Sequence, residues 1–151
     1  MMLRTHLAIT TLLILLFIPH VTFKVIFVIV ALIATLIPDI DMTHSVMGKY
    51  NILRPIQWFV KHRGIFHSFT LALLFSLLFA FYLPILALPF FLGYSSHLIA
   101  DSFTIDGIRP FWPLKDELKY KLRTGSRVES TIFYVLCGIN IILFVRLFYI
   151  M

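Results

Sequence analysis

The chain has 151 residues, of which 60% are hydrophobic and only 13% are charged. Soluble domains are about half apolar and about a quarter charged, so this composition argues against an ordinary soluble protein and indicates a membrane protein. The formal net charge of +6 raises the question whether nucleic acid or the membrane itself is the anionic partner.

The apolar residues occur in five blocks, which cover residues 7–18, 21–37, 69–83, 85–100 and 132–150. A spanning helix needs about 20 apolar residues, so the shorter blocks would project from the bilayer or thin it locally. No small-residue cleavage pattern follows the first block before Pro19, and we therefore interpret the first two blocks as a helical hairpin rather than a cleaved leader. The sequence predicts an all-α, polytopic membrane bundle of about five helices that forms a single domain over residues 1–151.

The basic residues are distributed unevenly between the two sides of such a bundle. With the N-terminus in the cytoplasm, only Lys24 lies on the far side, and Arg146 lies near the far end of the last block. This asymmetry follows the positive-inside rule and predicts a multi-pass protein of the inner or plasma membrane. Because topology already accounts for the charge, we expect the lipid bilayer as partner and not nucleic acid. The cytoplasmic residues are Arg4, Lys49, Arg54, Lys61, Arg63, Arg109, Lys115, Lys119, Lys121, Arg123 and Arg127.

Eight histidine and acidic residues stand next to the ends of the predicted helices. They occur before the first helix, in "IPDID" after the second, in "KHRGIFHSF" before the third, in "HLIAD" at the end of the fourth and in "GSRVES" before the fifth. Successive crossings alternate in direction, so all of these segments meet at one membrane face. The eight residues are His6, Asp39, Asp41, His62, His67, His97, Asp101 and Glu129.

Each of these groups has an ordinary structural interpretation when it is taken alone. His97 and Asp101 are four residues apart, which suits a hydrogen-bonded pair at a helix end as well as two ligands of one ion. Asp39 and Asp41 follow Pro38 and suit turn positions. Ionisable groups at a membrane interface are costly, however, and usually mark function. Their convergence therefore predicts a metal site at the cytoplasmic interface.

The composition of this set indicates which ion it would hold. Four histidines, three aspartates and one glutamate without a thiolate suit hydrolytic Zn²⁺, with Mn²⁺ or Fe²⁺ as alternatives. Eight candidates exceed the needs of one tetrahedral ion, so two or more ions are expected, as in enzymes that cleave phosphoesters with activated water. Asp39 or Asp41 would hold or deprotonate that water.

Other charged residues near these segments separate into binding candidates and controls. Arg63 and Arg127 are candidates to bind a substrate phosphate. Arg109 is better interpreted as a positive-inside residue. His20 falls on the opposite face and should not be a ligand, and His44 lies in a loop without a partner pattern.

The order of His6, "LIPDID", "HRGIFHSF", "GYSSHLIADSFTIDGIRPFWPL" and "GSRVES" resembles the YdjM-like family of inner-membrane-associated metal-dependent hydrolases, from residue 6 to about residue 130. That family is similar to zinc-dependent phospholipase C and to single-strand nucleases, in which a His-x-x-x-Asp helix pair helps to hold several zinc ions. The resemblance implies ligand roles for His97 and Asp101 and, by extension, for the other six residues. Phe66 departs from the His-Arg-Gly-x-Thr-His pattern of the family, so any hydroxyl contact of that threonine is lost here.

Three functional hypotheses follow from the sequence. The first is a membrane-embedded hydrolase that cleaves a phosphoester, such as a lipid headgroup. The second is a non-catalytic membrane protein whose metal is structural or regulatory and whose basic loop, residues 101–130, binds a cytosolic protein. The third is a metal or proton transporter, which the nearly all-apolar interior of the helices disfavours. A zinc-type intramembrane protease is also disfavoured, because no His-Glu-x-x-His occurs.

Overall fold

The computed structural model describes residues 1–41 and 64–150, and these residues form five α-helices and three short 3₁₀ turns without any β-strand. The all-α prediction is therefore confirmed. The 3₁₀ turns cover Ile18–His20, Ile37–Asp41 and Ile65–His67. The helices are α1 (Leu3–Phe17), α2 (Lys24–Leu36), α4 (Phe69–Tyr82), α5 (Pro84–Ser102) and α6 (Arg127–Ile150).

Local sequence signals determine where these helices begin and end. Pro38 lies in the turn that follows α2, and Pro84 opens α5, where the missing N–H of proline costs nothing. The Ser68 hydroxyl accepts a backbone N–H from the first turn of α4 at 3.3 Å. Likewise, the Ser126 hydroxyl accepts the backbone N–H of Glu129 at 3.2 Å before α6. These caps satisfy helix donors that would otherwise lack a partner.

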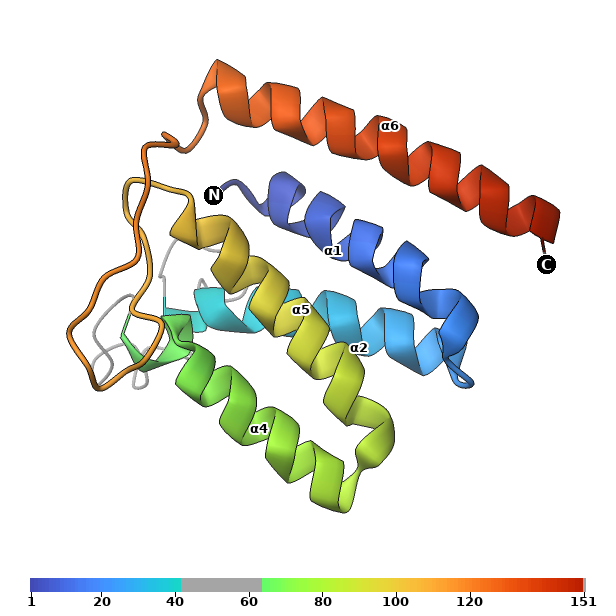
Figure 1. Ribbon diagram of the computed structural model, residues 1–151, viewed down its shortest axis with the longest axis horizontal. Helices are drawn as coiled ribbons and strands as arrows, with labels where there is room; N and C mark the ends of the chain where they lie inside the picture. Colours follow the sequence, from blue (N-terminus) through green and yellow to red (C-terminus); the bar gives the residue numbers. More distant parts are fainter. Residues whose placement is uncertain (42–63, 151) are drawn as a thin grey trace.

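The described helices run in alternating directions along the chain. The beginnings of α1, α4 and α6 and the ends of α2 and α5 consequently gather at one end of the bundle, which we call the site end (Figure 1). The loop between α5 and α6 folds over the same end: Ile108 and Leu118 exchange two backbone hydrogen bonds of 2.9 Å, and the Phe69 N–H donates to Pro110 O at 2.8 Å. The predicted convergence of helix ends is thus present in the fold.

Not all five helices are long enough to cross a membrane of ordinary thickness. Among the described residues, two segments are long and apolar enough to span a membrane: Leu3–His20 and Arg127–Leu147. At 1.5 Å per residue, α4 with 14 residues is only about 21 Å long, and α2 with 13 residues is shorter still. Polar residues around His97 lower the hydropathy of α5. Five helices are confirmed, whereas crossing by all five stays a prediction.

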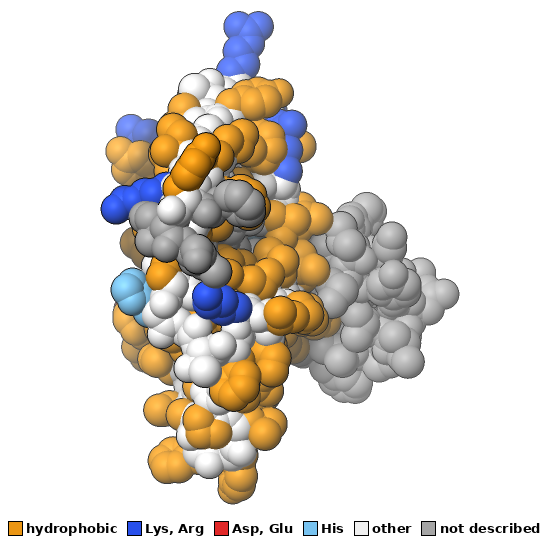
Figure 2. All heavy atoms as spheres, turned by 90° about the vertical axis from the view of Figure 1, so that its right-hand side faces the viewer, with side chains coloured by type: hydrophobic (Ala, Val, Ile, Leu, Met, Phe, Trp, Pro, Cys, Tyr) orange, Lys and Arg blue, Asp and Glu red, His pale blue; other side chains and the backbone are white. Residues whose placement is uncertain are grey.

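The outer surface of the bundle is apolar in a way that suits surrounding lipid. Large side chains such as Phe81 and Ile142 are 83% and 69% exposed. The end of the bundle opposite the site end is covered mainly by hydrophobic side chains, and no acidic side chain is in view there (Figure 2). Soluble monomers rarely expose apolar patches of this extent, so the surface fits a bilayer environment.

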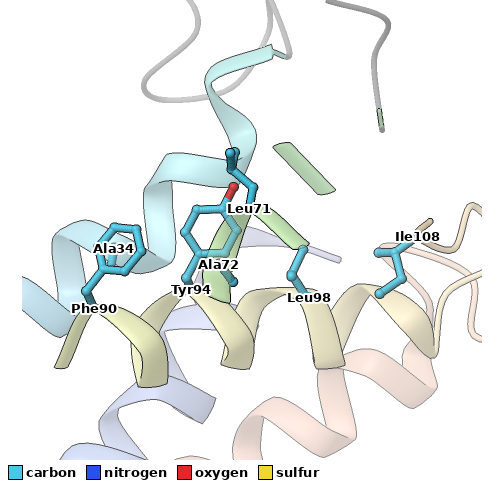
Figure 3. Packing of buried hydrophobic residues seen from close by; sticks show 7 residues of the cluster. All are labelled: Ala34, Leu71, Ala72, Phe90, Tyr94, Leu98 and Ile108. Atoms are coloured by element: carbon cyan, nitrogen blue, oxygen red, sulfur yellow. The ribbon is translucent and has the colours of Figure 1, made fainter. Parts of the chain in front are cut away.

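The core that supports the site end lies between α2, α4 and α5. Seven buried residues form it, and the ring of Tyr94 lies among them (Figure 3). The Tyr94 hydroxyl donates to Phe66 O at 2.6 Å, which attaches the turn before α4 to α5. This contact fixes the position of the next residue, His67. The seven core residues are Ala34, Leu71, Ala72, Phe90, Tyr94, Leu98 and Ile108.

Helices α2 and α5 approach closely at Gly93. A Cβ atom at this position would overlap the backbone oxygen of Ala31, and a backbone carbonyl cannot move aside cheaply. We expect Gly93→Ala to destabilise the protein by about 1–3 kcal/mol or more through overpacking. Thermal unfolding of the purified protein in detergent measures this as a lower Tm.

Gly138 in α6 provides the matched control for this substitution. A Cβ atom there meets no atom within 4 Å, so Gly138→Ala should leave the Tm unchanged or raise it, because alanine favours the helix. Equal Tm values for the two variants would contradict the close approach of α2 and α5.

Candidate metal centre

Four helix termini bring histidine and aspartate side chains together at the site end. His6 lies in the first turn of α1, and His67 is the last residue of the turn before α4. His97 and Asp101 lie one turn apart near the end of α5, and Asp39 lies in the turn after α2. The three histidines and Asp101 are buried. Burial of so many ionisable groups in one place requires a compensating partner for them.

These five residues form two overlapping triads. In the first triad, ligand atoms of His6, His97 and Asp101 all lie within 4.8 Å of one another. In the second triad, the same holds for Asp39, His67 and His97. His97 belongs to both, and its ring stacks on that of His6 with a centroid distance of 3.9 Å and an interplanar angle of 5°.

Asp101 connects the two triads through its two oxygen atoms. Asp101 Oδ1 lies 3.3 Å from His6 Nε2 and accepts the α-ammonium group of Met1 at 2.5 Å. Asp101 Oδ2 lies 3.7 Å from His67 Nε2 and 3.7 Å from His97 Nε2. One carboxylate thus faces different histidines with each oxygen, as a ligand shared by two ions would.

The orientation of the His97 ring is fixed by a backbone contact. His97 Nδ1 lies 2.8 Å from Thr35 O, and because a carbonyl only accepts, Nδ1 carries the proton. His97 Nε2 is therefore left with its lone pair, is buried, and has no hydrogen-bond partner among the described residues. This is the arrangement of a metal-binding histidine, whose second nitrogen is held by a carbonyl or carboxylate.

The donor set and its spacing fit a zinc-type ion. Atoms about 2.0–2.2 Å from a tetrahedral ion lie roughly 3.3–3.6 Å from one another. The His97 Nε2–Asp39 Oδ1 distance is 3.6 Å, and the His67 Nε2–Asp39 Oδ1 distance is 3.9 Å. Only small shifts would bring Asp39, His67 and His97 to ligand distance of one ion. A buried histidine nitrogen that points at two carboxylates supports the same fit.

The two carboxylates differ in their access to solvent. The Asp39 side chain is 23% exposed, whereas the Asp101 side chain is 3% exposed. Partial burial raises the pKa of the Asp39 carboxyl, against the lowering effect of His67 and His6. Asp39 is therefore the carboxylate that a molecule from outside can reach.

A layer of hydroxyl groups lies beneath the histidines, toward the interior of the bundle. Thr10 Oγ1 is 2.8 Å from Thr35 Oγ1 and 2.8 Å from Ser96 Oγ, and all three residues are buried. The three residues belong to α1, α2 and α5, so the layer joins the helices that carry His6, Asp39 and His97. Tyr94 and Ser96 thus have the structural roles that hydroxyls in membrane helices usually have.

Comparison with known protein families identifies the family of the chain. Residues 1–150 match the family described as YdjM inner membrane protein. The chain belongs to the YdjM inner membrane protein family. The prediction of a membrane location is thereby confirmed, whereas a site that faces the cytoplasm stays a prediction.

Two curated relatives show how much of their length this YdjM family member matches. The inner membrane protein YdjM of Escherichia coli (strain K12) is 38% identical in an alignment of 116 residues, with coverage of 68% of this chain and 58% of that protein. The uncharacterized protein YvsG of Bacillus subtilis (strain 168) is 32% identical in an alignment of 115 residues, with coverage of 72% of this chain and 70% of that protein. The chain thus spans less than two thirds of the length of YdjM from Escherichia coli. No solved structure matches the chain.

Glu129 takes a different position from the other predicted ligands of this YdjM family member. Its Oε1 accepts the Met2 N–H at 2.6 Å and the Thr5 hydroxyl at 3.1 Å, and its Oε2 accepts the Gly125 N–H at 2.6 Å. Glu129 is buried at the site end but belongs to neither triad. These hydrogen bonds make it a cap for the first turn of α1, next to the ammonium group of Met1.

The remaining predicted residues are distributed as follows. The side chain of Asp41 lies outside the described residues, as do His62 and Arg63. Arg127 is exposed in the first turn of α6. Arg109 forms an ion pair with Glu117 at 3.0 Å, and its interpretation as a positive-inside residue stays a prediction.

Two structural contributors carried no usable signal in the sequence. Thr35 acts through its backbone carbonyl, which every residue possesses, so only its place one turn before Asp39 hints at the contact. The α-ammonium group of Met1 reaches Asp101 across 100 positions of sequence, and no motif predicts that contact. The exposed His20 lies in the turn after α1, away from the triads, as predicted.

Proposed function

We propose that this YdjM family member is a membrane-embedded, metal-dependent hydrolase that cleaves a phosphoester, such as a lipid headgroup, with activated water. The observation that supports this proposal most strongly is the pair of triads that share His97. Four chain segments contribute nitrogen and oxygen ligands to one buried cluster, and no thiolate takes part. Structural zinc sites are typically rich in cysteine, so this donor set favours a hydrolytic site.

In this proposal, Asp39, His67 and His97 would hold one ion, with the carboxylate of Asp101 beside them. His97 offers only Nε2, because Nδ1 is bonded to Thr35 O, so it serves a single ion. A second ion would use His6 and Asp101 Oδ1, together with the predicted ligands Asp41 and His62, whereas the predicted ligand Glu129 would hold the first turn of α1 beside the site. Zn²⁺ suits these donors best, and Mn²⁺ or Fe²⁺ are alternatives. When bound, such ions activate water and stabilise the charge of a phosphoryl transition state.

Other residues of the chain would accept the proton, bind the phosphate and orient the ligands. Asp39, the more exposed carboxylate, accepts the proton of the attacking water, a role that Asp41 shares in our prediction. Arg63 and Arg127 bind the substrate phosphate and neutralise part of its charge. Thr35 holds His97 in one orientation, and the buried Asp101 carries negative charge that is inaccessible to substrate. The site would face the cytoplasmic leaflet.

Elemental analysis of the purified protein beside an assay with a chromogenic phosphodiester tests this proposal. We expect at least one zinc-type ion per chain, because the folded state brings the ligands together. We also expect slow hydrolysis of the phosphodiester. Dialysis against a chelator should abolish this hydrolysis, and added Zn²⁺ should restore it. Absence of stoichiometric metal would contradict the proposal. Stoichiometric metal without hydrolysis, together with capture of a cytosolic protein, would favour the non-catalytic alternative.

A further inference from the structure

A cleft of about 680 Å³ lies between α1, α5, α6 and the loop that precedes α6. Apolar side chains form most of its walls, including Ile9 from α1 and Ile99 from α5. The α6 wall consists of Val128, Ile132 and Leu136, which recur every four residues and so form one stripe along the helix. The volume falls within the range of about 300–1,000 Å³ that is usual for ligand pockets.

The loop side of this cleft is cationic. Lys121 and Arg123 are exposed residues of the loop before α6 and line the cleft, whereas no acidic residue does so among the described residues. Apolar walls alone would suit any hydrophobic ligand. Apolar walls with two cations at one side match an amphiphile that carries an anionic head.

The cleft also adjoins the candidate metal centre. Met1 and Ala100 are among its lining residues. The α-ammonium group of Met1 donates to Asp101 Oδ1 at 2.5 Å, and Ala100 directly precedes Asp101 in α5. A ligand in the cleft therefore lies next to Met1, which contacts Asp101, and next to Ala100, which precedes it; Asp101 is the carboxylate of the first triad.

The membrane around α6 indicates which amphiphile is available to the cleft. The apolar stripe lies within Arg127–Leu147, one of the two segments that can span a membrane. In the hydrocarbon region of a bilayer the apolar ligand at hand is the acyl chain of a lipid. The phosphate of that lipid lies at the depth of the helix ends, where the two cations are.

We propose that the cleft binds one acyl chain of an anionic glycerophospholipid from the bilayer, with the lipid phosphate beside Lys121 and Arg123. That this lipid is also the substrate of the neighbouring metal centre rests on the proposed function. Lipid binding itself requires no turnover and can be measured separately.

Photo-cross-linking in vesicles tests the proposal. A phosphatidylglycerol probe with a diazirine on its acyl chain, in a phosphatidylcholine background, should label residues that line the cleft on α5 and α6, as mapped by mass spectrometry. Val128 is 60% exposed, so Val128→Trp can fill the cleft without disturbing the core, and we expect roughly tenfold less labelling of the cleft residues. Val145→Trp, on the same helix but away from the cleft, should label like the wild type.

The cationic side of the cleft gives a second test that does not depend on Val128→Trp. Wild-type protein should be labelled more by the phosphatidylglycerol probe than by the matching phosphatidylcholine probe. The double variant Lys121→Glu, Arg123→Glu should bring the ratio of the two close to one. Equal labelling of the wild type by both probes, or labelling spread evenly around α6, would overturn the proposal.

Metal content of the same preparations separates this inference from the proposed function. Val128 and Lys121 lie outside both triads, so these variants should retain the metal of the wild type. Cleft labelling in a protein without metal would contradict the hydrolase proposal and support the lipid cleft. Full metal content without cleft labelling would overturn the lipid cleft alone.

Discussion

Replacing His97 with alanine is expected to remove bound metal from the purified protein and to abolish phosphodiester hydrolysis. His97 is the one residue common to both triads, and its Nε2 is buried and oriented by the bond from Nδ1 to Thr35 O. Loss of a residue that merely supports a ligand already costs 10–100-fold in metal affinity. Loss of a ligand itself should cost at least about 100-fold in metal affinity, measured as metal content after dialysis against a weak chelator.

His20 supplies the control for this substitution. It is exposed in the turn after α1 and belongs to neither triad, so His20→Ala should keep the metal content and the activity of the wild type. A His97→Ala protein that folds, as judged by its Tm, and still retains stoichiometric metal would rule out the triads as the metal site. A second substitution, His97→Gln, preserves side-chain volume and separates loss of the ligand from a packing defect.

Changing Asp39 to asparagine is expected to reduce the rate constant of hydrolysis much more than the metal content. Asp39 is the more exposed of the two triad carboxylates, and asparagine keeps one oxygen for an ion but no longer accepts a proton. Loss of a general base typically lowers kcat by about 10²–10⁴-fold. The measurement is kcat for a chromogenic phosphodiester at saturating Zn²⁺, beside elemental analysis of the same sample.

Glu117 is the matched acidic control for Asp39. It lies on the exposed loop before α6, where hydrogen bonds from Arg109 and Lys119 lower the pKa of its carboxyl. Glu117→Gln should leave kcat and metal content unchanged, because the residue is remote from the triads. If Asp39→Asn loses metal and activity in the same proportion, Asp39 is a ligand only, and the proton acceptor must be another group.

The convergence of the site residues could be predicted from sequence because it depends on topology alone. Apolar blocks interpreted as successive crossings alternate in direction, so His6, Asp39, His67 and His97 were expected at the same end of the bundle. The spacing of His97 and Asp101 placed both on one helical face, and the structure brings both into one triad. These inferences required the order of the helices but not their packing.

The finer assignments could not be made because they depend on atoms that every residue carries or on exact helix lengths. Glu129 reaches the site end as predicted, yet backbone N–H groups and the Thr5 hydroxyl take up its carboxylate. The structure places Glu129 in the first turn of α6 and not before it. A carboxylate at the start of one helix can cap a neighbouring helix as easily as it binds metal, and the sequence does not separate these outcomes. Hydropathy blocks similarly merged turns with helices, so α2 and α4 are shorter than their blocks.

The hydroxyl layer of Thr10, Thr35 and Ser96 also has a consequence for how ions and substrates move. Because it bonds α1, α2 and α5 to one another just inside the cluster, those three helices cannot separate on the interior side. Any widening that admits an ion must therefore occur at the outer side, around the half-buried Asp39. We therefore expect the cluster to open at its outer side alone. The rate of metal exchange should depend on local motion around Asp39 rather than on motion of the whole bundle.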